Sequence, residues 1–138
     1  MAHWLIKSEP ASWSWAQQVE AGSKGTFWNG VRNHTAKQYL MAMKIGEEAF
    51  FYHSNEGKEI VGIVEVIKTY YPDPSDVSGK FGMVDFRAVK PLKTPVSLEA
   101  IKADSRFKDM VLVNNSRLSV QPVSETEWKA ICKMGGLT

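Results

Sequence analysis

The sequence is poor in the residues that build disulfides and metal centres. Its 138 residues include one cysteine, Cys132, and three histidines, His3, His34 and His53, scattered along the chain. A single cysteine excludes an internal disulfide and any multi-cysteine metal site. Dispersed histidines without clustered partners do not make a metal motif. We therefore expect no metal and no cofactor, and we infer a reducing, intracellular setting.

Long hydrophobic runs are also missing. No apolar segment approaches the length needed to cross a bilayer. The first residues, Met1 to Lys7, lack the basic start and the long apolar stretch of a signal peptide. We therefore expect no membrane partner and a cytoplasmic location, or a nuclear one if the source is a eukaryote.

Neither sign of charge dominates. The formal net charge is +2, which permits nucleic-acid binding but does not demand it, since strongly basic domains leave a clearer footprint. With 23% charged and 43% hydrophobic residues the chain should be globular. Its length suits one domain, so we predict a single domain over residues 1–138, present as a monomer.

The signatures of common enzymes are absent from the sequence as well. It contains no Gly-x-Ser-x-Gly elbow, no glycine-rich phosphate loop and no dinucleotide fingerprint. His53 and Ser54 are neighbours, but adjacent residues on a strand point to opposite faces and are poorly placed to act together. We therefore predict that the protein is not an enzyme.

The pattern of apolar residues predicts an α+β domain with a partly closed sheet. Strands are expected at residues 3–7, 47–53, 59–67 (or to 70), 83–89 and 118–123, and Pro91 and Pro95 place the segment after 89 at an edge. Short helices are expected after the caps Ser12 or Ser14, Asn33, Ser97 and Ser124, with the second ending at Ile45–Gly46. Residues 107–113 are not assigned. Five or six strands without a βαβ rhythm favour a mixed barrel.

One loop combines residues that suit a flat ligand. The stretch from Phe27 to Asn33 holds Trp28, Gly30, Arg32 and two asparagines without the period of a helix or a strand. Trp28 can stack on a base, Gly30 lets the backbone come close, and the asparagines can bond a base edge. The alternative is a loop whose tryptophan fills the core.

Polar residues elsewhere extend this hypothesis. Ser54 and Asn55 follow a predicted strand and can bond a base edge, while Lys7, Arg32 and Arg117 can contact phosphates. The alternative is that Asn33 only caps a helix and that Ser54–Asn55 only forms a turn.

Five motifs in order carry a resemblance to the EVE domain family, to which the thymocyte nuclear protein group belongs. The motifs are WLIKSEP (4–10), WNGVRN (28–33), FYHSN (51–55), IVGIVEV (60–66) and YPD (71–73). The resemblance implies an α+β, PUA-like small β-barrel of five to six mostly antiparallel strands flanked by short helices. It also implies kinship with YTH readers of methylated adenine in RNA, and a non-catalytic module that binds a modified base.

The resemblance also implies where the base would bind. The pocket would lie between the end of the first strand, the Trp28 loop and the Ser54–Asn55 turn, with modified cytosine in DNA or a modified base in RNA as ligand. A small-molecule or nucleotide-metabolite sensor using the same pocket is the alternative. The implied lining is Ser8, Trp28, Asn29, Val31, Arg32, Asn33, His53, Ser54, Asn55, Leu118 and Ser119, with Lys7, Arg32 and Arg117 on phosphates.

Overall fold

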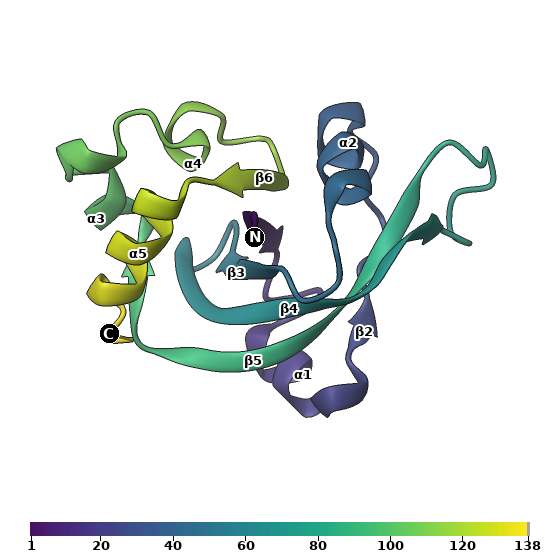
Figure 1. Cartoon of the computed structure of the whole chain (residues 1–138), viewed down its shortest axis with the longest axis horizontal. Helices are drawn as coiled ribbons and strands as arrows, with labels where there is room; N and C mark the ends of the chain where they lie inside the picture. The colour runs from purple at the N-terminus through teal and green to yellow at the C-terminus, as the bar shows by residue number, and fades with distance from the viewer. Residues whose placement is uncertain (138) are drawn as a thin grey trace.

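A single curled sheet organises the chain in the computed structural model, which describes residues 1–137 (Figure 1). Six strands join in the order β2-β5-β4-β3-β1-β6. Within these residues, β1 and β3 are the one parallel pair, and the other neighbours are antiparallel. The predicted α+β class with five to six mostly antiparallel strands is therefore confirmed. The strands are β1 His3–Ser8, β2 Thr26–Phe27, β3 Glu48–His53, β4 Glu59–Pro72, β5 Gly82–Ser97 and β6 Val120–Val123.

The sheet curls strongly but its hydrogen bonding does not close. Within residues 1–137, β2 and β6 are its two edges and do not pair with each other. The long strands β4 and β5 bend along their length (Figure 1), and their register shifts at four places. Such irregularities bend and twist a strand pair. The predicted barrel is therefore an open, curled sheet.

The four helices whose caps the sequence predicts begin at those residues. Ser14, Asn33, Ser97 and Ser124 each accept a hydrogen bond from a backbone N–H in the first turn of the helix that follows. Ser14 and Ser124 also form capping boxes with Gln17 and Glu127. The helices are α1 Trp15–Glu20, α2 His34–Ala42, α3 Leu98–Lys102, α4 Val111–Asn114 and α5 Glu125–Met134, with 3-10 turns at Gly22–Lys24 and Ser105–Phe107.

The second helix is shorter than predicted. It ends at Ala42, and Met43 already has extended backbone and a buried side chain. The buried Glu47 explains this end, because its carboxylate accepts hydrogen bonds from the Lys44 N–H and from Trp4 Nε1. Gly46, with φ +87°, belongs to the turn before β3 and not to the helix end.

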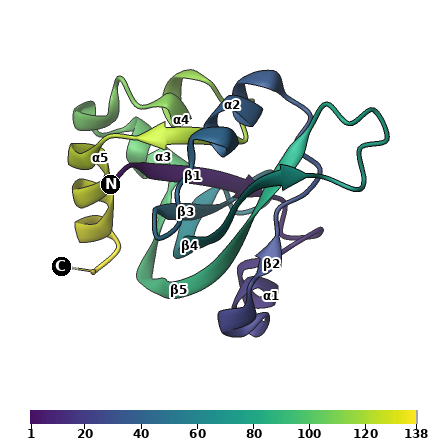
Figure 2. The same ribbon diagram turned by 45° about the vertical axis from the view of Figure 1, so that its right-hand side comes forward.

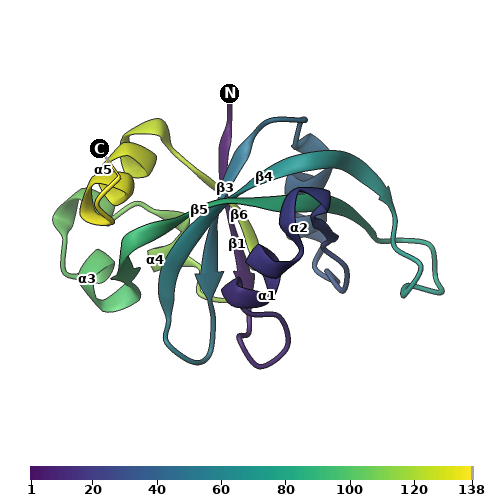
Figure 3. The same cartoon turned by 90° about the horizontal axis from the view of Figure 1, so that it is seen from below.

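Two clusters of buried side chains lie on opposite faces of the sheet. On β1, Trp4 and Ile6 join one cluster while Leu5 joins the other, as the alternation of a strand requires. α2 covers the first cluster, and Trp15 of α1 and Val111 of α4 also pack against it. The second cluster is covered by α3, α4 and α5, and Figure 3 shows α3 and α5 on the opposite side of the molecule from α2. The curled sheet is thus the shared wall of two cores.

Several strands differ in length from the prediction. β4 runs on to Pro72, and the strand expected from Leu118 begins only at Val120. The unassigned segment 107–113 ends one 3-10 turn and begins α4. Within residues 1–137, β5 pairs with no strand other than β2 and β4, and β2 pairs with it only at Asp85 and Phe86. The predicted edge position of Pro91 and Pro95 is therefore confirmed.

Among residues 1–137, no helix is both long and apolar enough to span a membrane.

Candidate functional site

A pocket of about 370 Å³ opens where β1 ends beside the loop that follows β2. The structure brings four of the predicted residues, Lys7, Ser8, Trp28 and Asn29, to this one place. Its volume falls within the usual range for small-ligand sites. The full lining is Lys7, Ser8, Glu9, Ser12, Trp13, Thr26, Phe27, Trp28 and Asn29.

Trp28 forms a fixed wall of this pocket. It is 8% exposed, and its ring meets Phe51 and Phe86 edge-on, with centroids 5.6 and 5.7 Å apart and interplanar angles of 85° and 88°. Its backbone N–H donates to Val84 O at 2.8 Å. Trp28 therefore packs into the core and lines the pocket at the same time. The two interpretations of this residue, as a wall for a flat ligand and as a core residue, are compatible.

Trp13 supplies a second aromatic side chain to the same pocket. Its Nε1–H donates to Gln18 Oε1 at 2.8 Å, and the buried Gln18 donates through Nε2 to Phe86 O at 3.0 Å. Ser8 Oγ donates to the carbonyl of Trp13. Both tryptophans are therefore connected to Phe86: Trp28 contacts the Phe86 ring, and Trp13 is linked through Gln18 to the Phe86 carbonyl.

A buried carboxylate holds the loop that carries Trp28. Asp73 Oδ2 accepts from the Gly30 N–H at 2.9 Å and from Arg32 Nη1 at 3.1 Å, and Oδ1 accepts from Ser75 N and Oγ at 2.8 and 2.6 Å. Burial by itself would raise the pKa of Asp73. The hydrogen bonds from Ser75, Gly30 and Arg32 outweigh burial and lower the pKa to about 2. The loop is thus fastened to the hairpin between β4 and β5.

Other predicted site residues have structural partners instead of facing this pocket. Asn33 Oδ1 accepts from Ala36 N as the cap of α2, and Val31 is buried in the first cluster. His53 Nε2 accepts from the Trp15 N–H at 3.0 Å, and burial lowers its pKa.

The predicted site residues at 117–119 do not line the pocket beside Trp28 either. Leu118 is buried in the first cluster, and the Ser119 carbonyl accepts the Lys7 N–H at 2.9 Å. Arg117 is exposed and does not line either recess beside Lys7.

The structure divides the predicted pocket into two recesses. Ser54 and Asn55 line a neighbouring recess of about 280 Å³, and Lys7 lines both. Lys7 Nζ donates to Ser116 O at 2.8 Å, and burial lowers its pKa. The pocket beside Trp28 and the recess at the 54–55 turn are therefore separate hollows that share Lys7.

The pocket contains residues that the sequence does not single out as one site. Glu9, Ser12, Thr26 and Phe27 line it because the chain turns back after Pro10 and β2 pairs with β5. Gln18 gives no local signal, because its role depends on a contact with a strand 68 residues later. The signal in the sequence that points to this part of the pocket is the pair of tryptophans at 13 and 15, of which Trp13 lines it.

The site offers stacking and hydrogen bonding. Among residues 1–137, no group of three or more His, Cys, Asp or Glu side chains is arranged to hold a metal ion. The ring of His53 already accepts a backbone N–H through Nε2, so that nitrogen is not free to take a proton from Ser54. The geometry therefore suits the binding of a flat, polar-edged molecule.

A curled mixed sheet with helices on both faces and an aromatic pocket at the end of β1 defines a PUA-like domain. The sequence profile of the EVE domain matches residues 2–134. The chain belongs to the EVE domain family.

Relatives and solved structures agree with this assignment. Thymocyte nuclear protein 1 of Gallus gallus is 35% identical, over 96% of this chain and 68% of that protein. The NMR structure of a Rhodopseudomonas palustris protein is 63% identical with a TM-score of 0.94, over 99% of this chain and 94% of the other. Human THYN1 in complex with DNA containing 5-methylcytosine is 33% identical with a TM-score of 0.91, over 98% of each chain.

A more distant structure shares the fold. The YTH domain of Zygosaccharomyces rouxii MRB1, in complex with N6-methyladenosine RNA, is 21% identical with a TM-score of 0.57. This likeness supports the predicted relation of the two folds.

Proposed function

We propose that this protein is a non-catalytic reader that accepts a modified nucleobase in the pocket lined by Trp13 and Trp28. The observation that carries the proposal is the pair of tryptophans, both fastened to Phe86 at one small pocket. The complex of human THYN1, 33% identical, with DNA containing 5-methylcytosine supports it. The partner is a nucleic acid strand, and modified cytosine in DNA is the favoured ligand.

The chemistry of the lining fits a base of this kind. Stacking on one aromatic side chain is worth about 1–3 kcal/mol, which matches the few kcal/mol needed to extrude a base from a duplex. Glu9 can accept from the exocyclic amino group of cytosine, as carboxylates do in base recognition. Asn29 can donate to an acceptor on the same base edge. Edge bonds and stacking together would supply the selectivity.

The three predicted phosphate contacts have different roles in this proposal. Arg32, 40% exposed at its side chain, is engaged by Asp73 and Ser75 and mainly holds the loop. Lys7 lies beside the pocket with its ammonium fixed by Ser116, and Arg117 is free of such bonds in the described chain. Of these three residues, Lys7 and Arg117 are thus the ones whose charge can attract a strand.

The test is a binding panel with Trp28→Ala and a matched control. Trp128 is also a buried tryptophan, 7% exposed, but it packs in the second cluster against His3 and Phe50. The panel uses DNA and RNA, single strands and duplexes, with and without modified cytosine or adenine, below the melting temperature of each variant. We expect Trp28→Ala to lose roughly 5- to 150-fold in affinity for the modified strand, from the stacking energy above.

Trp128→Ala should keep the preference despite its lower stability. A Trp28→Ala variant that discriminates modified from unmodified strands as well as the parent would overturn the assignment. Equal affinity of the parent for a free modified nucleoside and for a strand carrying it would favour a metabolite sensor using the same pocket.

A further inference from the structure

The recess on the other side of Lys7 gathers positive charge from three separate elements. Lys7 comes from the end of β1, Lys58 from the turn between β3 and β4, and Lys102 from the end of α3. The whole chain carries a net charge of only +2, so three lysines around about 280 Å³ form a local concentration of charge. The other lining residues are Tyr52, Ser54, Asn55, Leu98, Leu112 and Ser116.

These lysines are not neutralised by neighbouring carboxylates. Within residues 1–137, the ion pairs involve Arg32, Arg87, Arg106 and Lys129, and none of them includes a lysine of this recess. Glu99 lines the adjoining hollow with Lys58 and Lys102 but does not pair with either. An anion of fitting size would therefore enter a site with no competing acid in its lining.

The backbone around the recess is held in place. The Ser54 N–H donates to Ser8 O at 2.9 Å, which joins the turn to β1. The Leu98 N–H donates to Lys58 O at 2.8 Å, which joins the same turn to the start of α3. Asn55 and Lys58 have φ of +68° and +48°, left-handed backbone that non-glycine residues adopt at a cost. The turn therefore presents Lys58 from a constrained position.

Lys7 connects this recess to the base pocket. Its ammonium uses one donor on Ser116 O, which leaves two of its three donors free. Burial lowers the pKa of Lys7, and a bound anion would restore the charged form because opposite charge raises the pKa of an amine. A strand whose base fills the pocket would pass Lys7 on its way to the recess.

We propose that the recess of Lys7, Lys58 and Lys102 binds a backbone phosphate of the strand whose modified base occupies the pocket. This inference rests on the proposed function. Ammonium groups supply the charge, and Ser54, Asn55 and Ser116 offer hydrogen bonds to the phosphate oxygens. The site fixes where the strand runs and is indifferent to its sequence.

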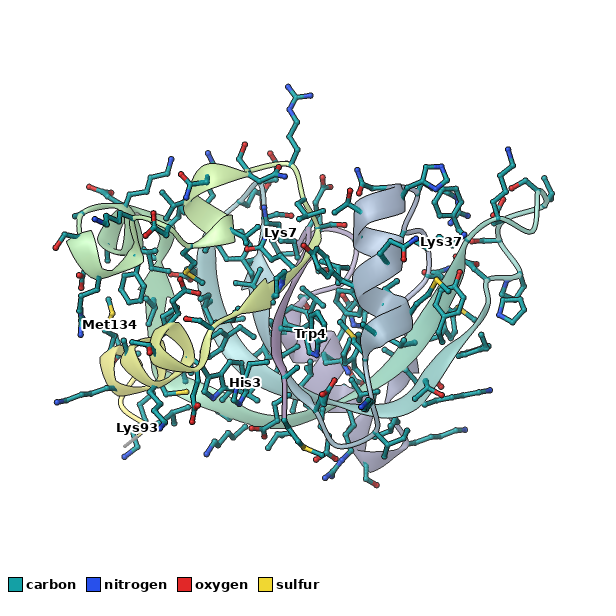
Figure 4. The ribbon with its side chains drawn as sticks, turned by 45° about the horizontal axis from the view of Figure 1, so that its top comes forward. His3, Trp4, Lys7, Lys37, Lys93 and Met134 are labelled. Carbon is teal, nitrogen blue, oxygen red and sulfur yellow. The ribbon has the colours of Figure 1, made fainter. Side chains whose placement is uncertain are left out.

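The test compares two double variants of equal charge change. Lys58→Gln with Lys102→Gln removes two cations of the recess but leaves Lys7 and the base pocket intact. Lys90→Gln with Lys93→Gln removes two exposed lysines of β5, and Figure 4 shows Lys93 at the far side of the molecule from Lys7. Binding of a short single strand with a modified cytosine is measured across a salt series, beside binding of the free modified nucleoside.

We expect the recess variant to flatten the plot of log affinity against log salt by about 0.7 for one lost phosphate contact. At about 0.1 M salt the affinity of the recess variant for the strand should be roughly fivefold lower than that of the parent. Near about 1 M salt the two affinities should become similar. Its affinity for the nucleoside should not change, and the β5 variant should follow the parent on both ligands.

Equal salt slopes for the two double variants would overturn the phosphate site, even where the preference for the modified base persists. Failure of the proposed function looks different. In that case the parent itself shows no preference for a modified strand, and the slopes on an unmodified strand still report whether the recess binds phosphate.

Discussion

Asp73 shows how much one buried side chain controls at the residue scale. Its carboxylate joins Gly30 and Arg32 of the Trp28 loop to Ser75 of the hairpin, and its side chain is fully buried. Removing this carboxylate would break four hydrogen bonds at once, two of them to the Trp28 loop and two to Ser75, which is costly. We therefore regard Asp73, outside the pocket, as the residue that sets the loop geometry.

Asp73 should make stability depend on pH in acid. Its pKa is about 2 in the folded protein against an ordinary value of 3.8, so the folded state binds the proton less readily than the unfolded state. The stabilisation is complete above about pH 4 and is lost as the pH falls toward 2, amounting to about 2 kcal/mol. Urea unfolding of the parent and of Asp73→Asn between these pH values measures it.

Asp73→Asn should be less stable than the parent at neutral pH, and the gap should narrow as the pH falls. A gap that stays constant between pH 5 and about pH 2 would contradict the pKa assignment.

At the scale of elements, α1 matters because it sets the position of Trp13. The helix has only six residues, too few to be stable alone. Its capping box at Ser14, the Gln18 bridge to Phe86 and the packing of Trp15 against Gly62 hold it on the sheet. A side chain at 62 would place its Cβ 2.4 Å from the Trp15 ring, so a larger residue at this position would displace Trp15 and the start of α1.

Gln18→Leu should loosen Trp13. The variant leaves the Trp13 Nε1–H and the Phe86 carbonyl without a partner, at a cost of about 1–3 kcal/mol. We expect a lower urea midpoint together with weaker binding of the free modified nucleoside. Gln38→Leu, the same chemical change at an exposed position of α2, is the control. Unchanged nucleoside affinity in Gln18→Leu would show that Trp13 does not contact the base.

The sequence predicts those elements whose signals are local. Caps such as Asn33 and Ser124, and the alternation along residues 83–89, depend on neighbours within a few positions, and the structure confirms them. The predicted end of α2 at Ile45–Gly46 was wrong, because the carboxylate of Glu47, which lies beyond the helix, accepts the Lys44 N–H. The division of the site into two recesses could not be predicted, since it depends on β1, the 54–58 turn and α3 meeting in space.

At the scale of the whole molecule, two cores share one sheet and should unfold together. Leu40 lies in the cluster under α2 and Ile131 in the cluster under α5, and both are fully buried. Leu40→Ala and Ile131→Ala should each lower the free energy of unfolding by about 2–5 kcal/mol. Because β1, β3, β4, β5 and β6 each contribute side chains to both clusters, the transition should remain single when followed by tryptophan fluorescence and by far-UV circular dichroism.

Separate midpoints for the two probes in either variant would show that one side of the sheet unfolds on its own. Coincident midpoints in both variants would show that Leu40 and Ile131 belong to one cooperative unit.

The placement of β1 has a consequence for the newborn chain on the ribosome. Its neighbours are β3 and β6 (Figure 2), and His3 pairs with Val123. β1 leaves the exit tunnel long before β6 and thus waits for it before both of its edges are covered. Until then Trp4, Leu5 and Ile6 present an open, apolar strand edge, which is a template for pairing between chains. Slow translation before residue 120 would prolong this exposure and favour aggregation.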